Sequence, residues 1–236
     1  CLIMEPVLGS GGFITSTVEF LQAARSLTRR YGALLILDEV ISGFRFRAGD
    51  LGRLYGVQPD LAIFGKVMGG GMPVAAVAGR KDVMNLVSKA GGSRVQFNGG
   101  TYSAHPASML AARTMLKHVI THEDEIYPKL AKMGSAYRQT MQAVFDKAGI
   151  PAVASGEIPP ELGGSSLAAM HFPYQPGSRV IHPDFASDPS FCDVLLRTEV
   201  LPLALILEDI HIITTHGAVT VDHGEEELSF FKTGLE

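Results

Sequence analysis

The sequence predicts an α/β protein built on a mainly parallel β-sheet, followed by a smaller α+β region. Short, fully apolar runs alternate with segments whose apolar residues recur every three or four positions. Such runs are typical of strands covered on both faces, and the alternation indicates strand–helix–strand units, which make parallel sheets. Apolar residues make up 46% of the 236 residues, so the chain can bury a sizeable core.

The first strand–helix–strand unit lies at the start of the chain. Residues 1–4, "CLIM", form a continuous apolar run that predicts a buried strand, and residues 33–37, "ALLIL", predict the next one. Between them, Ser16 and Glu19 have the spacing of a capping box that begins a helix, and Gly32 suits the position after its end. The apolar face predicted for this helix consists of Phe20, Ala24, Leu27 and Tyr31.

Two further strands and two helices follow. Residues 60–64, "DLAIF", and 73–79, "PVAAVAG", predict the third and fourth strands. Pro106 suits the first turn of a helix, and a second helical pattern extends over residues 126–144. The apolar faces expected for these helices are Met109, Ala112, Leu116 and Val119 in the first and Ile126, Leu130, Met133, Tyr137, Met141 and Val144 in the second.

The pattern changes after Gly149. A turn-rich break precedes an apolar run at 167–172 that predicts a strand, and residues 191–200 and 210–215 predict a helix and a last strand. We therefore expect two domains, 1–120 and 121–236.

Composition excludes several classes of function. The formal net charge of -4 and the absence of a basic run argue against a nucleic-acid partner. No apolar stretch is long enough to cross a bilayer, so no membrane partner is predicted. Two cysteines, Cys1 and Cys192, form no disulfide framework, which favours a reducing, cytoplasmic location. The chain begins with Cys inside a predicted strand, and we expect a further N-terminal portion to precede it.

Asp38 follows the apolar run 33–37 directly. Ligands of open α/β sheets bind outside the carboxyl ends of the strands, and Asp38 is expected there. A partly desolvated carboxylate needs a cation or hydrogen bonds to stay charged. Two interpretations stay open: Asp38 serves the next turn or pairs with an arginine, or it contacts a ligand.

Lys66 stands where the third strand runs into a glycine-rich loop. It is either a surface lysine or a nucleophilic one, because an amine freed from its proton by desolvation attacks carbonyl carbons. A phosphate-binding P-loop is excluded, since Asp60 and Val67 occupy the positions of its first glycine and its hydroxyl residue. No dinucleotide-binding glycine motif follows any strand. Pyridoxal phosphate explains both residues, because it bonds to a lysine amine and an acid keeps its ring nitrogen protonated.

Three segments, "LLILDEVISGFR" (34–45), "PDLAIFGKVMGGGMPVAAVAGR" (59–80) and "GGTYSAHPASMLAA" (99–112), resemble the class III aminotransferases of pyridoxal-phosphate fold type I. The subgroup that contains glutamate-1-semialdehyde 2,1-aminomutase is the most similar in appearance. The resemblance is dense to about residue 120 and weaker beyond it. It implies the large cofactor-binding domain of that fold, or its C-terminal part, followed by the small domain.

The resemblance implies roles for individual residues. Lys66 resembles the lysine that forms the Schiff base with pyridoxal 5'-phosphate and then moves the proton on the substrate. Asp38 resembles the partner of the pyridine nitrogen, and Val40 the side chain packed against one ring face. Thr101 resembles the threonine that reaches the cofactor phosphate of the neighbouring subunit, which implies a homodimer. Glu5 belongs to the "EPV" motif without a defined role.

Two segments depart from the subgroup. It usually has Ser-Gly-Asn-Pro where this chain has Ser103–Pro106, "SAHP", and Gly-Asn-Met-Gly where this chain has Gly9–Gly12, "GSGG". The family's upstream phosphate-binding loop and ring-stacking aromatic residue are not in this sequence. The expected function is amino-group transfer between a small-molecule amino donor and an oxo acceptor, by an aminotransferase or an aminomutase. The alternatives are a racemase or epimerase on the same scaffold, or a catalytically incomplete fragment.

The sequence predicts no metal site. His118 and His122 lie beside Glu123 but lack an evident third ligand. Three histidines near the C-terminus, His211, His216 and His223, are expected to have a structural or pocket-rim role.

Overall fold

A computed structural model describes residues 1–87 and 99–236, and the described chain divides into two compact units. The first unit consists of Cys1–Pro6 and Ser16–Glu123, and the second of Val7–Thr15 and Asp124–Glu236. Nothing in the sequence indicated that Val7–Thr15 packs with the second unit. Each unit is described by itself below.

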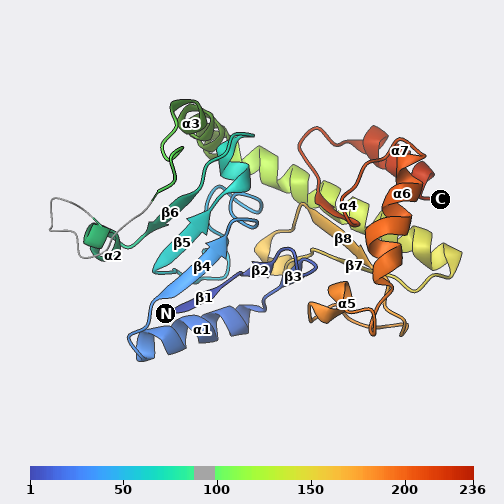
Figure 1. The fold of residues 1–236 in the computed structure, drawn as a ribbon, viewed down its shortest axis with the longest axis horizontal. Helices are drawn as coiled ribbons and strands as arrows, with labels where there is room; N and C mark the ends of the chain where they lie inside the picture. The colour runs from blue at the N-terminus through green and yellow to red at the C-terminus, as the bar shows by residue number, and fades with distance from the viewer. Residues whose placement is uncertain (88–98) are drawn as a thin grey trace. The chain divides into compact units, whose positions relative to one another are not determined.

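The first unit is built on a four-stranded sheet (Figure 1). Its strands are β1 (Leu2–Met4), β4 (Leu35–Glu39), β5 (Leu61–Phe64) and β6 (Ala76–Gly79), in the order β1-β4-β5-β6. The first three are parallel, and β6 runs antiparallel to β5. The four apolar runs therefore form the predicted strands, in a mainly parallel sheet.

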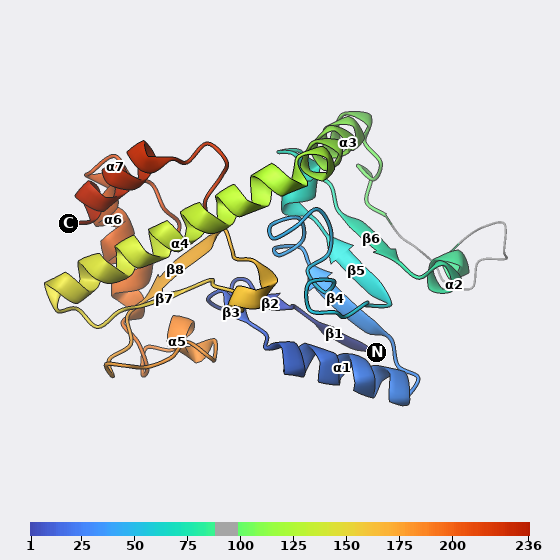
Figure 2. The ribbon, with the colours of Figure 1, turned by 180° about the vertical axis from the view of Figure 1, so that it is seen from behind.

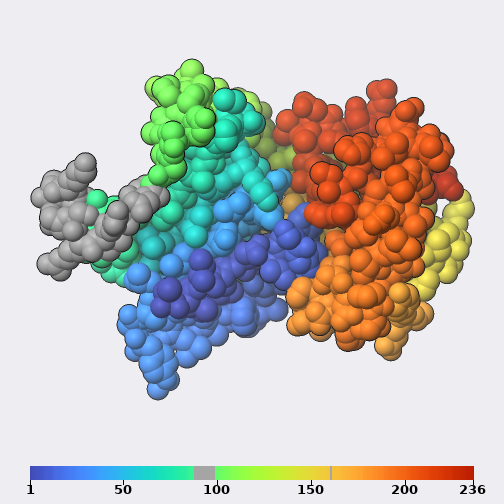
Figure 3. All heavy atoms as spheres, viewed as in Figure 1, coloured from blue at the N-terminus to red at the C-terminus, as the bar shows by residue number. Residues whose placement is uncertain are grey.

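The two faces of this sheet differ in burial. Leu35, Leu37 and Glu39 are fully buried on one face, where α1 packs against β4. On the other face Ile3 is 56% exposed and Val77 42%. Atoms of the strands are visible on the near side of the unit in Figure 3. Within the described residues of this unit, the expectation that both faces are covered is met on one face only.

Helix α1 (Val18–Arg30) begins one residue later than the capping box predicts. Thr17 is the N-cap, and its hydroxyl accepts the Phe20 N–H at 3.2 Å. Gly32 takes the left-handed φ of 64° expected after the helix end. The predicted apolar face is wrong apart from one member, because the buried side chains are Leu21, Ala24 and Thr28, whereas Phe20, Leu27 and Tyr31 are exposed.

The rest of the first unit consists of short helices and one long one. The 3-10 helix η1 (Lys66–Gly69) follows β5, and α2 (Lys81–Met84) and η2 (Asn85–Val87) follow β6. Helix α3 (Pro106–Thr121) has Pro106 at its first position, as predicted, and buries Ala112 and Val119. Across the described residues, no helix combines the length and the apolar character needed to span a membrane.

The second unit packs a long helix against a three-stranded antiparallel sheet (Figure 2). Helix α4 (Glu123–Ala148) buries Met133, Tyr137, Met141 and Val144, as its periodicity predicts. The sheet has the order β7-β8-β9, and its apolar side chains Met170 and Phe172 pack with Met141 and Phe145. The strands of this sheet are β7 (Val153–Ser155), β8 (Leu167–His171) and β9 (His216–Ala218).

The last strand lies later than expected. Residues 210–215 form no strand; Thr214 and Thr215 have left-handed φ values of 46° and 55°, which interrupt an extended chain. Strand β9 begins at the next residue. The remaining elements are η4 (Pro160–Leu162), α5 (Asp184–Ser187), the π-helical η5 (Leu196–Val200), α6 (Leu201–Ile206) and α7 (Glu225–Leu235).

A hairpin from the start of the chain belongs to this second unit. Its strands are β2 (Val7–Leu8) and β3 (Ile14–Thr15). The Ser155 hydroxyl donates to Gly12 O at 2.6 Å and lies 2.8 Å from His171 Nε2, so the imidazole proton is on Nε2. A Cβ at Gly12 would lie 2.9 Å from the His171 ring. The glycine therefore permits this close approach, and the hydrogen bonds fix the hairpin loop to the sheet.

Candidate active site

Asp38 and Val40 lie at the carboxyl end of β4, as predicted. Both side chains are partly buried and alternate with the buried Leu37 and Glu39, so they share the less covered face of the sheet. The Val40 N–H donates to Asp38 Oδ1 at 3.1 Å. The other carboxylate oxygen has no hydrogen-bond partner among residues 1–87 and 99–236, so it is available to a ligand donor.

The neighbouring strand brings Lys66 to the same edge. Asp38 pairs with Ile63 in the parallel ladder, so the next residues of both strands also lie side by side. A Cβ at Gly65 would lie 3.4 Å from Val40 Cγ1, which is ordinary contact distance. The backbone immediately before Lys66 therefore packs against the Val40 side chain.

Lys66 has a strained backbone. Its φ of 45° is left-handed, which is uncommon for a residue other than glycine and is often found at functional sites. The turn ends at Gly70, whose N–H donates to Val67 O at 3.1 Å. The side chain is exposed, so the described residues do not provide the desolvated setting expected for a nucleophilic amine. No hydrogen bond or ion pair within the described chain holds its amine.

The structure thus brings Asp38, Val40 and Lys66 to one edge of the sheet. No hydrogen bond or ion pair joins Asp38 to Lys66 within the described ranges. Thr101 lies apart, in an exposed turn before α3, and its predicted contact with a neighbouring subunit's cofactor stays a prediction.

The turn that holds Thr101 contains a strained alanine. Ala104 has a φ of 57°, the left-handed region that glycine occupies without cost. This residue stands where the resembled subgroup usually has glycine. Ala104→Gly is expected to stabilise the protein by about 0.5 to 1 kcal/mol, because relief of about 1 to 2 kcal/mol of strain exceeds the added entropy of the unfolded chain.

Urea denaturation of both proteins measures this difference. Ala107→Gly is the matched control. Ala107 is the second residue of α3, so this substitution is expected to destabilise the protein by about 1 kcal/mol. Equal losses from the two substitutions would show that Ala104 carries no strain.

Sequence reasoning missed three residues of this sheet, Glu39 and Gly65 at the carboxyl end of the strands and Asp60 at the opposite end. Glu39 is a fully buried carboxyl group, Gly65 contacts Val40, and Asp60 binds two arginines below the sheet. The burial of Glu39 could have been predicted. Successive side chains of a strand point to opposite faces, so Glu39 faces the core if Asp38 faces away from it. The sequence around Asp60 does not indicate that Arg25 and Arg80 bind it.

The other candidates have structural contacts. Arg45 Nε donates to Ile41 O at 2.7 Å, and Arg47 donates to Asp50 O at 3.4 Å and pairs with Glu123 at 3.9 Å, so both have structural partners. The rings of His118 and His122 are 4.7 Å apart. In the described part of the chain, no three His, Cys, Asp or Glu side chains are grouped as metal ligands.

Comparisons with known proteins agree on one family. The model of the family described as aminotransferase class-III matches residues 1–154. Glutamate-1-semialdehyde 2,1-aminomutase of Persephonella marina is 40% identical over 152 residues, which are 64% of this chain and 34% of that protein. The enzyme of the same name from Pyrobaculum aerophilum is 47% identical over 136 residues, 56% of this chain and 31% of that protein. The chain thus spans about a third of the length of these relatives.

Solved structures match nearly the whole chain. An omega-transaminase from Sphaerobacter thermophilus has a TM-score of 0.83 and 29% identity, and the match covers 99% of this chain and 50% of that one. A beta-phenylalanine aminotransferase from Variovorax paradoxus has a TM-score of 0.82 and 27% identity, again over 99% and 50% of the two chains. These matches confirm the predicted fold class.

Proposed function

Because the chain belongs to the class-III aminotransferase family, we propose that it serves pyridoxal-phosphate-dependent amino-group transfer between a small-molecule amino donor and an oxo acceptor. The carrying observation is the pairing of β4 with β5, which brings Asp38, Val40 and Lys66 to one sheet edge. The chain spans half of the solved transaminase chains it matches, so the activity is proposed for the protein that contains this part.

The residues present fit the cofactor. Asp38 offers a carboxylate oxygen without a partner in the described chain, suited to a protonated ring nitrogen. The Val40 side chain and Gly65, which has no side chain, form an apolar surface next to Asp38. The Lys66 amine has no partner in the described ranges. When bound, pyridoxal phosphate supplies an aldehyde that takes up amines and a ring that withdraws electrons from the substrate.

Each residue has one task in this proposal. The Lys66 amine would hold the cofactor and would carry the proton to and from the substrate carbon. The Asp38 carboxylate keeps the proton on the ring nitrogen, and Val40 orients the ring by packing against its face. Thr101 would bind a phosphate in a homodimer, from the neighbouring subunit.

The second candidate is an aminomutase, which returns the amino group to the same molecule. It is favoured by the names of the two relatives described above, both of which are aminomutases. The altered Gly9–Gly12 and Ser103–Pro106 segments favour the aminotransferase instead. Release of a free oxo acid in the presence of an amino donor distinguishes the two.

Covalent labelling tests the proposal. The protein is incubated with pyridoxal phosphate, reduced with borohydride and digested, and the labelled lysine is located by mass spectrometry. We expect the label on Lys66, because it follows β5 at the same end of the sheet as Asp38 and Val40 and its amine has no partner in the described chain. Lys66→Ala should remove it, whereas Lys117→Ala, an exposed lysine on α3, should not. A label spread over surface lysines and unchanged in Lys66→Ala would refute the assignment.

A further inference from the structure

Glu39, the residue after Asp38, is buried, and no lysine or arginine of the described residues pairs with it. Its exposed fraction is 0%, and it points to the covered face of the sheet with Leu35 and Leu37. The two carboxylate oxygens accept the Leu51 N–H at 2.9 and 2.7 Å. The Gly52 N–H at 3.4 Å and the Ser42 hydroxyl at 3.3 Å add weaker contacts.

These contacts close a loop. Residues 40–50 leave the strand at Val40 and return at Leu51, where the Glu39 carboxyl group binds them. The loop starts with the N–H that Asp38 accepts, so neighbouring acids anchor its two ends from opposite faces. Its path has little freedom, because a Cβ at Gly43 would lie 2.6 Å from the Phe64 ring and 2.7 Å from Glu39 O.

The charge of Glu39 responds to pH near neutrality. Burial raises the pKa of Glu39, the N–H groups of Leu51 and Gly52 and the Ser42 hydroxyl lower it, and the Asp50 carboxylate raises it, with a net value of about 7. Asp50 is the charged group that acts on it from the far end of the loop. A carboxyl group that gains a proton loses acceptor capacity, so protonation weakens its hold on the loop.

We propose that Glu39 is a positioning residue of the cofactor site, which holds loop 40–50 and through it the Asp38 carboxylate and the Val40 side chain in place for pyridoxal phosphate. This inference rests on the proposed function for its ligand, but the positioning itself is a property of the cofactor-free protein. Asp38 and Val40 contact the ring, whereas Glu39 acts only through the loop.

The first experiment follows the Asp38 carboxyl carbon by NMR as pH is varied in the cofactor-free protein. In the wild type we expect an inflection of the Asp38 signal near pH 7, where Glu39 titrates, and none in Glu39→Gln. A merely structural role for Glu39 would not couple the two signals. Identical Asp38 curves in both proteins would overturn the proposal.

Ser42→Ala gives a second test if Glu39→Gln folds poorly. The Ser42 hydroxyl lowers the pKa of Glu39, so its removal should move the inflections of Glu39 and Asp38 to higher pH together. A shift of the Glu39 signal without the Asp38 signal would count against positioning.

Affinity for pyridoxal phosphate completes the design. We expect Glu39→Gln to weaken binding at least about tenfold, and Asp82→Asn, an exposed acid on α2, to leave it unchanged. Wild-type affinity in Glu39→Gln, with Lys66 labelled in both, would refute the positioning role alone. A wild type with coupled Asp38 and Glu39 signals but no label on Lys66 would refute the proposed function and leave the positioning role supported.

Discussion

Replacing Asp60 by alanine is expected to lower the free energy of unfolding by about 3 to 5 kcal/mol. Asp60 is 1% exposed and accepts Arg25 at 2.5 Å, Arg80 at 2.7 Å and the Leu35 N–H at 2.8 Å. It therefore joins α1, β4 and the end of β6 at the start of β5. Without it, the Arg25 side chain, only 11% exposed, would keep its charge in a buried place without a carboxylate.

Asp82 provides the control, because it binds the same Arg80, at 2.6 Å, but is 65% exposed. Asp82→Ala should cost less than about 1 kcal/mol, as exposed ion pairs do. Urea denaturation of both variants and the wild type gives the comparison. Similar losses from Asp60→Ala and Asp82→Ala would contradict the central role of the buried carboxylate.

The same carboxylate predicts how stability varies with pH. Burial by itself raises the pKa of Asp60, but hydrogen bonds from Arg25, Arg80 and Leu35 outweigh it and hold the pKa well below its usual range. A lowered pKa contributes stability that is present above the unfolded value of about 4 and is lost as pH falls toward the folded value. Below about pH 4 the wild type should therefore lose more stability than Asp60→Ala.

Arg138→Ala is the second large effect that we expect, a loss of about 3 to 4 kcal/mol in the second unit. Arg138 is 6% exposed and donates to Ser165 O at 3.1 Å and to Leu167 O at 2.7 Å. The carbonyl groups stay buried after truncation and lose these donors. One turn earlier, a Cβ at Gly134 would lie 2.0 Å from Ser165 O, so the helix is too close to the strand for water to enter easily.

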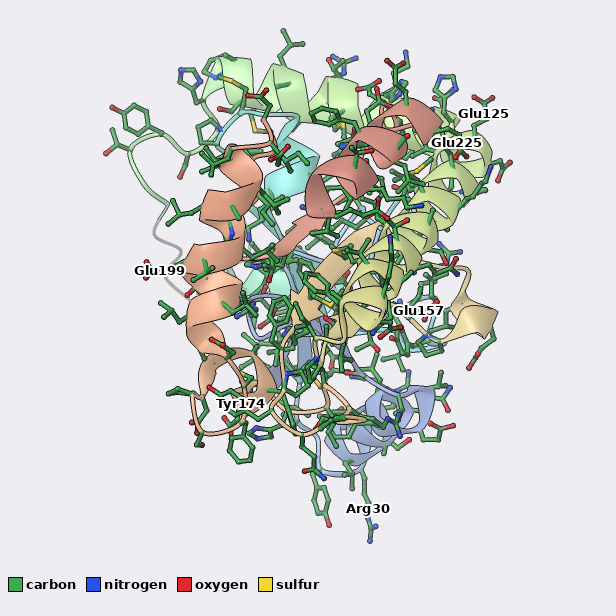
Figure 4. All side chains as sticks on the ribbon, turned by 90° about the vertical axis from the view of Figure 1, so that its right-hand side faces the viewer. Arg30, Glu125, Glu157, Tyr174, Glu199 and Glu225 are labelled. Carbon is green, nitrogen blue, oxygen red and sulfur yellow. The ribbon has the colours of Figure 1, made fainter. Side chains whose placement is uncertain are left out.

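Lys132 on the same helix is the matched control. It is 78% exposed and lies 3.8 Å from the equally exposed Glu225, so Lys132→Ala should change stability by less than about 0.5 kcal/mol. Glu157, labelled in Figure 4 beside α4, lies 3.6 Å from Arg138 but is 66% exposed. If Glu157→Ala destabilised the protein as much as Arg138→Ala does, the ion pair and not the carbonyl contacts would be the cause.

The four strands of the first sheet and β8 could be predicted from the sequence, because their apolar runs are short and flanked by glycine or proline, whereas the strand expected at 210–215 was wrong. The inner face of α1 could not be predicted, since two overlapping sets of residues fit helical spacing. Thr28 is buried with its hydroxyl bonded to Arg25 O, while the apolar Leu27 is 52% exposed. A periodicity argument considers only which side chains are apolar. It does not take into account that a hydroxyl can be buried when it donates a hydrogen bond to a carbonyl of its own helix.

The positions of Asp38 and Lys66 could be predicted from the sequence. Asp38 lies at the carboxyl end of β4 and Lys66 two residues after β5, so their position at the same end of the sheet follows from parallel pairing. The alternation of β4 indicates that Glu39 faces the core, but the backbone partner of Glu39 at Leu51 and the two arginines bound by Asp60 could not be assigned, because they lie 12 to 35 residues away in the chain. Such contacts depend on how loops return to the sheet, which local patterns do not encode.

The hairpin Val7–Thr15 has a practical consequence for dissecting the protein. Since this hairpin is bound by Ser155 and His171, a gene divided after codon 123 would separate it from the sheet that holds it. In the downstream product the Ser155 hydroxyl would lack its carbonyl acceptor. The upstream product would carry the hairpin without the sheet that it packs against. Co-expression or a tethered copy of the hairpin would be needed to recover either piece in its native state.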